Sequence, residues 1–218
     1  MIDTKQRILD TAEQLFGAQG YDATSLRHII TEAGVNLAAI HYHFGSKEEL
    51  LDELIVRRAG PVNERRIALL DQVEAESGAG PPALEKVLEA LLVPMSEAAD
   101  RNPEFVRLMG RMYAEGMMGA ILQSHFQEVI ARFVAAMRKA LPELPEHELL
   151  WRIHFMTGAM AHTMCGPPDY TRVSSEPSPF RNRIARLIAF LSGGFRAPLP
   201  VGQADPEGTP PANPEVSQ

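Results

Sequence analysis

The stretch between Gly34 and Leu50, GVNLAAIHYHFGSKEEL, decides the fold of the N-terminal part of this chain. Gly34 can adopt a left-handed turn without steric cost, and Asn36 is a good cap for a helix. The pattern therefore predicts a tight turn followed by a short helix over residues 37–43. Such a helix, placed directly after a glycine turn, is typical of the second half of a helix-turn-helix.

The short helix has little apolar surface of its own. Only Ile40 and Phe44 stand at the i, i+4 spacing that lets a helix pack on a core. The remaining side chains are left for an exterior partner: Leu37, Ala38, Ala39, His41, Tyr42 and His43. Ser46 and Glu49 form a capping box, which predicts that a longer helix begins there.

Two further helices are predicted upstream. Asp3 is a candidate cap and Gly20 a candidate stop for the first. Its apolar stripe consists of Ile8, Leu9, Ala12, Leu15 and Phe16. The second helix is expected from Ser25 to Ala33. Short helices in this order predict a unit that places one helix in the major groove of DNA. A helical hairpin that does not bind DNA is the alternative.

The region over residues 3–56 resembles the TetR family of one-component transcriptional regulators. The matching segments are Thr24-Ser25-Leu26-Arg27, Ala33-Gly34-Val35 and the string from Tyr42 to Leu50. The resemblance implies an all-α fold of nine or so helices, with an N-terminal helix-turn-helix domain and a C-terminal domain for ligand binding and dimerisation. It also implies a homodimeric repressor that binds palindromic double-stranded DNA and is released by a small molecule.

The resemblance assigns DNA contacts by position. It implies phosphate contacts at Thr24, Ser25, Tyr42, His43 and Lys47, and base or backbone contacts at Asn36, Leu37, Ala38, Ala39 and His41. The chain departs from the usual pattern at His41, where the family more often has tyrosine, and along Leu37-Ala38-Ala39. Small apolar side chains can contact thymine methyl groups but cannot form bidentate hydrogen bonds, so the bases that are read stay open.

The negative net charge of the chain is unusual for a protein that binds the phosphate backbone of DNA. Its formal net charge is −7, and residues 1–60 contain six Lys or Arg against nine Asp or Glu. The sequence therefore lacks a broad basic footprint, and contacts to phosphates must come from Arg27, Lys47, hydroxyl groups and helix N-termini. We expect a modest salt dependence of DNA binding.

Composition argues against several other classes. The single cysteine, Cys165, cannot form an internal disulfide and fits a reducing cytoplasm, which is the expected location. The sequence has neither an apolar run long enough for a membrane span nor a signal-peptide core. It also lacks metal ligands at useful spacing and a phosphate-binding glycine loop, so no metal and no cofactor are expected.

Proline and glycine divide the rest of the chain into further helices. We expect helices over residues 46–77, with a kink at Gly60-Pro61, and over residues 83–99, 104–115, 117–140, 145–164 and 180–192. Residues 197–218 contain six prolines and little to bury, which predicts a disordered tail. The expected organisation is a DNA-binding domain over residues 1–56, an effector-binding and dimerisation domain over residues 57–196, and the tail.

The C-terminal helices are rich in methionine: eight of the ten methionines lie between residues 104 and 164. Methionine adapts to irregular cavities, so this region favours an apolar ligand pocket. The candidate ligand-binding residues are Phe105, Met109, Met112, Leu122, Phe126, Arg152, Phe155, Met156 and Met160. Among them, Arg152 could orient an acidic head group. Ordinary core packing is the alternative for each residue.

Two late helices carry faces of small residues that permit close helix approach. The candidate dimer interface consists of Gly158, Ala161, Ile184, Ala185, Ile188 and Leu191. Packing within one subunit is the alternative.

A narrower resemblance concerns the effector. The string from Trp151 to Thr163, with Val35–Ala39, Gly60-Pro61 and Leu141–Pro145, resembles the fatty-acid-responsive, PsrA-type branch of the family. It implies a long-chain fatty acid or its CoA ester as effector.

Two other functions remain open. A helical enzyme could use Cys165, or Ser124 beside His125, but neither has a recognisable base and orienting partner in the sequence, so we do not expect an enzyme. A protein-interaction module that does not bind DNA is the third possibility.

Overall fold

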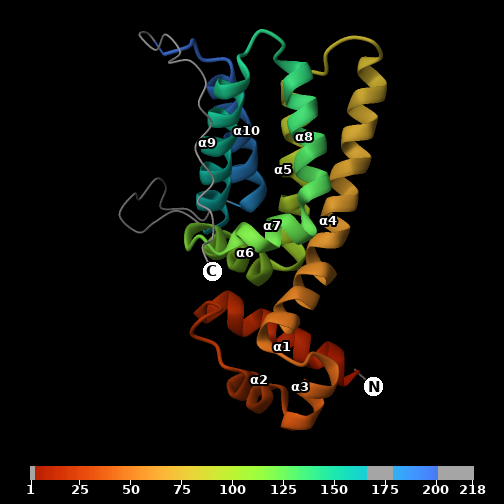
Figure 1. Ribbon diagram of the computed structural model, residues 1–218, viewed down its shortest axis with the longest axis vertical. Helices are drawn as coiled ribbons and strands as arrows, with labels where there is room; N and C mark the ends of the chain where they lie inside the picture. Colours follow the sequence, from red (N-terminus) through yellow and green to blue (C-terminus); the bar gives the residue numbers. More distant parts are fainter. Residues whose placement is uncertain (1–2, 166–178, 201–218) are drawn as a thin grey trace, which may run out of the picture.

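The computed structural model of the protein describes residues 3–165 and 179–200. Within these ranges it contains ten α-helices and no strand, which confirms the expected all-α class (Figure 1). The helices are α1 Thr4–Gln19, α2 Leu26–Ala33, α3 Leu37–His43, α4 Lys47–Ser77, α5 Leu84–Arg101, α6 Pro103–Ala114, α7 Met118–His125, α8 Gln127–Ala140, α9 Glu146–Cys165 and α10 Phe180–Phe195.

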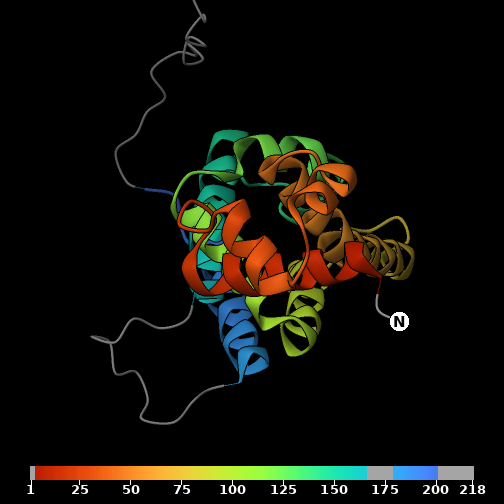
Figure 2. The ribbon, with the colours of Figure 1, turned by 90° about the horizontal axis from the view of Figure 1, so that it is seen from below.

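The first helices form a small unit at one end of the molecule. We call α1–α3 with the first turns of α4 the N-terminal unit (Figure 1). Helix α4 leaves this unit and runs along the side of a larger bundle, in which α5, α8, α9 and α10 stand roughly upright. Helices α6 and α7 lie across the bundle on the side that faces the N-terminal unit, and Figure 2 views the molecule from that unit's end.

The caps predicted for the N-terminal unit are confirmed. The side chains of Asp3 and Asn36 cap α1 and α3, and Ser46 with Glu49 forms the capping box of α4. Ser25, which we expected to be the first residue of the second helix, instead caps α2. Gly34 has φ of 60°, the left-handed conformation that glycine adopts at the end of a helix. These helices begin and end where the sequence predicts because their signals are local.

Helix α4 runs without a break through Gly60 and Pro61. It also crosses the expected boundary between the two domains, at residues 56 and 57. A proline normally clashes with the Cβ atom of the residue before it when that residue is helical. Gly60 has no Cβ atom, which removes this clash and leaves the loss of one backbone hydrogen bond as the main cost of Pro61.

The prediction of a single helix over residues 117–140 is wrong. Phe126 has φ of −126° and ψ of −2°, outside helical geometry, and separates α7 from α8. Its side chain is only 9% exposed, so burial in the bundle overrides the local helical pattern at this position. This break accounts for one helix more than the nine expected.

The last helix also differs from its prediction. We expected Gly193 and Gly194 to stop it, but α10 continues to Phe195. Phe195 is 2% exposed and Arg196 forms an ion pair with Glu85 of α5, so tertiary contacts hold the final turn. The predicted tail falls mostly outside the described residues. In the described part, no helix is both long and apolar enough to cross a membrane.

The N-terminal unit packs on the bundle mainly through α6. A Cβ atom at Gly17 would lie 2.7 Å from Glu104 Cβ, so α1 and α6 approach closely. Arg111 Nη1 of α6 also donates a hydrogen bond of 3.2 Å to the carbonyl of Ala18. These contacts and the continuous helix α4 both connect the N-terminal unit to the bundle.

Candidate functional site

Helix α3 presents an exposed face at the free end of the molecule. Ile40 is fully buried and Phe44 is 5% exposed, so these two side chains fix the helix on α1 and α2 as predicted. Tyr42 and Leu37, in contrast, are 85% and 56% exposed. Ala38 and His41 are exposed as well, which leaves this face of α3 accessible to a partner.

Thr24 does not lie on this accessible surface. Its side chain is fully buried, and its hydroxyl donates a hydrogen bond of 2.8 Å to the carbonyl of Gly20. The phosphate contact expected for the Thr24 side chain is therefore wrong, because the hydroxyl is used to close the turn between α1 and α2. Ser25 and Arg27, by contrast, are exposed at the start of α2.

Two further candidate DNA-contact residues, Lys47 and His41, are held in place by contacts with neighbouring groups. Lys47 Nζ lies 4.0 Å from the centre of the Tyr21 ring, a cation–π contact that positions the ammonium group at the start of α4. Burial and the nearby Glu48 carboxylate raise the pKa of Tyr21 to about 12, so its phenol stays neutral at physiological pH. His41 Nδ1 lies 3.0 Å from the carbonyl oxygen of Gly45, which fixes the ring at the end of α3.

An acidic groove borders α3 on the side of α4. Glu48, Glu49, Asp52 and Glu53 line it with Tyr42, His43 and Phe44. The carboxylates are engaged within the protein: Glu49 caps α4, Asp52 contacts His125, and Glu53 pairs with Lys5 at 2.7 Å. The carboxylates of this groove disfavour a bound phosphate, so we expect an anionic partner to approach α3 from the side of α2 and from Lys47 at the start of α4.

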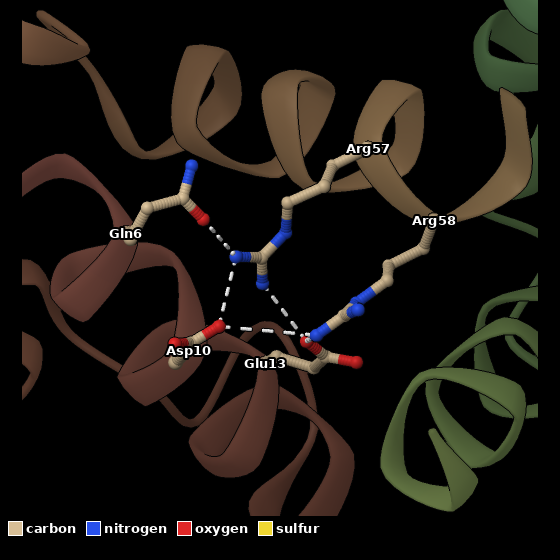
Figure 3. A network of polar contacts seen from close by, with 5 residues as sticks. All are labelled: Gln6, Asp10, Glu13, Arg57 and Arg58. Carbon is tan, nitrogen blue, oxygen red and sulfur yellow. Dashed lines mark hydrogen bonds and ion pairs between the residues drawn. The ribbon is translucent and has the colours of Figure 1, made fainter. Parts of the chain in front are cut away.

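A polar network holds α1 against α4 (Figure 3). Arg57 Nη2 and Arg58 Nη2 both reach Glu13 Oε2, at 2.9 and 2.6 Å, and the Glu13 side chain is only 7% exposed. Arg57 Nη1 also donates to Gln6 and Asp10 at 3.0 and 2.8 Å. These contacts come from two consecutive positions of α4, so they join α1 to this part of α4 at several points.

The bundle encloses a cavity of about 220 Å³ between α4, α5, α6, α7, α8 and α9. Its wall is almost wholly apolar and methionine-rich. The lining side chains are Ala59, Val62, Arg66, Leu91, Met95, Ala98, Phe105, Val106, Met109, Tyr113, Met118, Leu122, Phe126, Val129, Ile130, Phe133, Val134, Met137, Ile153, Met156, Thr157, Met160 and Met164.

The structure brings together six of the nine predicted ligand residues. They are Phe105, Met109, Leu122, Phe126, Met156 and Met160, which all line this cavity. Met112 is buried but does not line it, because its side chain lies in the core on another face of α6. The sequence gives helical spacing but not the side of the helix on which a cavity opens.

Two other predicted ligand residues point away from the cavity. Phe155 is 64% exposed and stacks on Trp151, with ring centres 5.7 Å apart. Arg152 is buried, but it pairs with Glu148 at 3.1 Å and donates to the carbonyl of Phe195 at 2.9 Å. Its guanidinium therefore joins α9 to the end of α10 and does not line the cavity.

Sequence reasoning missed the cation that does line the cavity. Arg66 stands on α4 between Val62 and Leu70, at i, i+4 spacing within an apolar stripe. An arginine at such a position is the signal that could have found it, because a charged residue on a core-facing stripe is rare. Tyr113 of α6, also not predicted, lines the same cavity.

The candidate dimer residues divide into two groups. Ala161, Ile184 and Leu191 are 6%, 2% and 4% exposed within one subunit, so their assignment to a subunit interface is wrong. They pack inward, because α9 and α10 contact each other and the rest of the bundle. Gly158 and Ala185 are exposed and Ile188 is half-buried.

A band of large apolar side chains lies on the exposed faces of the same two helices. Leu150, Trp151 and Phe155 of α9 are 51%, 56% and 64% exposed, and Phe190 of α10 is 70% exposed. We call these four residues the aromatic band. Exposed large apolar side chains on neighbouring helices are typical of a surface that a partner covers.

The other sequence candidates do not assemble into a site. No group of three His, Cys, Asp or Glu side chains that could hold a metal occurs among residues 3–165 and 179–200. Burial raises the pKa of the Cys165 thiol, which makes it a poorer nucleophile than an ordinary cysteine.

The fold and these two sites define a class: a helix-turn-helix unit joined to a helical, cavity-containing domain. The same class emerges from comparison with known proteins. Residues 8–54 match the family described as bacterial regulatory proteins, tetR family, and residues 87–194 match the tetracyclin repressor-like C-terminal domain. The chain belongs to the TetR family of transcriptional regulators.

Two curated relatives each match a short segment of this chain. The HTH-type transcriptional regulator SrpR of Pseudomonas putida is 38% identical over 60 residues, 28% of each chain. The HTH-type transcriptional regulator AcrR of Shigella flexneri is 46% identical over 52 residues, 24% of each chain. The match thus spans about a quarter of these relatives' length.

Solved structures match nearly the whole fold. The ketosteroid transcriptional regulator KstR2 of Mycobacterium tuberculosis superposes with a TM-score of 0.61 at 19% identity, over 89% of this chain and 95% of that chain. A putative tetR family transcription regulator from Shewanella sp. PV-4 superposes with a TM-score of 0.57 at 23% identity, over 88% of this chain and 97% of that chain. At this identity the likeness shows the fold alone.

Proposed function

We propose that the protein is a homodimeric repressor that binds a palindromic operator through α3 and is released by an apolar effector in the bundle cavity. The observation that carries this proposal is the exposed face of α3 on a capped, rigid helix-turn-helix. Tyr42 and Leu37 project from this face, and Ile40 anchors it. A helix held in this way is suited to enter a major groove.

The DNA contacts follow from exposure and chemistry. We assign phosphate contacts to Ser25, Arg27, Tyr42, His43 and Lys47, which offer hydroxyl, imidazole or cationic groups around α3. We assign base contacts to the outer face of α3, made by the exposed Leu37, Ala38 and His41 and the half-buried Ala39, with Asn36 at the N-terminus of the helix. Because this face is short and mostly apolar, sequence reading depends on thymine methyl groups and on two copies binding together.

The aromatic band supports a dimer. Its side chains come from α9 and α10, at some distance from α3, so a partner that covers the band leaves the α3 face free (Figure 1). A second copy with the same band would bury Trp151, Phe155 and Phe190 against their counterparts around a two-fold axis. Gly158, Ala185 and Ile188 lie on the same helices and would allow the subunits to approach closely.

The cavity supports an apolar effector, and a long acyl chain suits its shape-tolerant methionine wall. Its walls include α4 and α6, which also contact the N-terminal unit. An effector that favours a different arrangement of α4 and α6 would shift the separation of the two α3 helices in the dimer. It can do so only by binding the released state more tightly than the operator-bound state.

Selection from random double-stranded DNA tests the proposal. We expect the purified protein to enrich a palindrome whose half-sites lie about one helical turn, roughly 34–36 Å, or a small multiple of it, apart. Tyr42→Phe should weaken binding to all sequences, whereas His41→Ala should change the enriched sequence. Failure to enrich any sequence would contradict the proposed function.

A further inference from the structure

Arg66 is a buried cation without an ionic partner in the described part of the chain. The residue is 8% exposed, and its guanidinium donates 2.8 Å from Nε to the carbonyl of Leu91 and 3.1 Å from Nη1 to Asn63 Oδ1. Both acceptors are neutral, and no carboxylate of the described residues pairs with it. Burial lowers the pKa of Arg66 to about 10, so the group remains charged at neutral pH.

A buried charge that is paired only with neutral groups is costly. Three other largely buried arginines do have carboxylate partners: Arg57 and Arg58 share Glu13, and Arg152 pairs with Glu148. Arg66 instead stands in the wall of the cavity, where an incoming molecule can reach it. The missing counter-charge is therefore best supplied by a ligand.

The rest of the wall defines the ligand further. Arg66 is the only charged residue that lines the cavity within the described ranges, and Tyr113 and Thr157 are the other polar ones. Thr157 donates its hydroxyl proton to the carbonyl of Ile153, which leaves the Tyr113 phenol as a second donor beside the guanidinium. Burial raises the pKa of Tyr113, which keeps this phenol protonated.

We propose that the cavity binds a monocarboxylic acid with an apolar body, whose carboxylate pairs with Arg66 and accepts a hydrogen bond from Tyr113. The proposal rests on the proposed function, since it names the chemical class of the effector. A single guanidinium matches the single charge of a carboxylate and its two-oxygen geometry. A phosphate monoester carries more charge and would need further cations, which this wall does not provide.

Matched ligands test the proposal without any mutation. Isothermal titration calorimetry would compare decanoic and hexadecanoic acids with 1-decanol and 1-hexadecanol, which have the same apolar bodies. We expect the wild-type protein to bind each acid about tenfold to a hundredfold more tightly than its alcohol, the effect of a charge-assisted hydrogen bond. Equal affinities for acid and alcohol would overturn the proposal and leave the apolar effector site of the proposed function standing.

Variants then assign the preference to one residue. Arg66→Gln should remove the preference for the acid while alcohol affinity stays within about twofold. Arg107→Gln, the same change at an exposed arginine of α6 that pairs with Glu104, should keep the preference. If Arg66→Gln fails to fold by circular dichroism, Arg66→Met serves instead, because it fits an apolar wall.

The remaining outcomes are also decisive. Retention of the acid preference in a folded Arg66 variant would overturn the proposal and assign the carboxylate to another group. Binding of neither acid nor alcohol by the wild type would overturn both this proposal and the apolar effector. Operator selection with the same protein reports independently on the DNA-binding half of the proposed function.

Discussion

His125 Nε2 lies 2.6 Å from Asp52 Oδ1, which ties the end of α7 to the second turn of α4. The backbone carbonyl of His125 also accepts a hydrogen bond of 3.2 Å from Asn63 Nδ2, and Asn63 Oδ1 accepts one from Arg66 at 3.1 Å. The next residue, Phe126, lines the cavity. A continuous set of polar contacts therefore connects the cavity cation with the N-terminal unit.

We expect Asp52→Ala to weaken the ligand response without weakening ligand binding. Asp52 does not line the cavity, so the affinity for decanoic acid should stay unchanged. Loss of its contact with His125 should reduce the effect of the ligand on operator affinity by about fivefold, a coupling loss of about 1 kcal/mol. Fluorescence anisotropy of labelled operator, with and without saturating decanoic acid, measures the effect.

Glu64→Ala is the matched control, since Glu64 is another exposed carboxylate of α4. It should keep the full ligand response. An Asp52→Ala protein that is released from operator as readily as the wild type would exclude the contact as a route of coupling.

The stability of the N-terminal unit should depend on Glu13. Its buried carboxylate receives both Arg57 and Arg58, so Glu13→Ala leaves these two partly buried guanidinium groups with only the more exposed Asp10 as a carboxylate partner (Figure 3). We expect a loss of about 2–4 kcal/mol in the free energy of unfolding, measured by urea denaturation. Asp10→Ala removes a carboxylate that is 53% exposed and should cost no more than about 1 kcal/mol. Equal losses in the two variants would contradict the assigned role.

The local parts of this fold could be predicted from the sequence. The first helices were placed by caps such as Asn36 and Ser46, whose hydrogen bonds form within three residues. The burial of Ile40 and Phe44 followed from their spacing alone. Each of these features depends on near neighbours in the chain, which a single sequence displays directly.

The features that could not be predicted depend on contacts between distant helices. The break at Phe126 and the extension of α10 to Phe195 result from burial against other helices. Arg152 was assigned to the ligand and Arg66 was missed for the same reason. Both are arginines near apolar faces, and only the packing of the bundle puts Arg66 in the cavity wall and Arg152 beside Glu148. Thr24 was likewise assigned to DNA because its buried bond to Gly20 is not visible in sequence.

The close approach of α6 and α9 should make Gly110 intolerant of substitution. A Cβ atom there would lie 2.8 Å from Met164 Cβ and 3.0 Å from the backbone nitrogen of Cys165. We expect Gly110→Ala to lower the free energy of unfolding by about 1–3 kcal/mol through overpacking. Gly119→Ala on α7, where an added Cβ meets nothing within 4 Å, should be neutral or stabilising. A stabilised Gly110→Ala protein, by chemical denaturation, would show that the helices can separate at no cost.

The ion pair between Glu85 and Arg196 should produce a pH dependence of stability in the acid range. The Arg196 hydrogen bond lowers the pKa of Glu85 from 4.5 to about 2. A lowered folded-state pKa means that the stabilisation is fully present above pH 4.5 and is lost as the pH falls towards about 2. Both side chains are nearly half exposed, so the effect should not exceed about 1 kcal/mol.

The comparison of wild type with Glu85→Gln isolates this pair from the other carboxylates. The urea midpoints of the two proteins should differ at neutral pH and converge as the pH falls from 4.5 towards about 2. A difference that stays constant with pH would mean that the Glu85 carboxylate is not stabilised by Arg196.

The aromatic band should control the oligomeric state. Phe155→Glu and Phe190→Glu each put a charge where a second copy would bury an aromatic ring, so we expect either variant to shift the protein from dimer to monomer. Val56→Glu is the control, because Val56 is 52% exposed on α4, outside the band. Sedimentation velocity at micromolar concentration distinguishes the species. Circular dichroism should show unchanged helix content in all three variants, since each of these side chains is exposed within one subunit.

The monomeric variants should also lose affinity for a palindromic operator, because a single α3 reads too few base pairs to bind tightly alone. A dimer that persists in both phenylalanine variants would move the subunit interface to another face of the molecule.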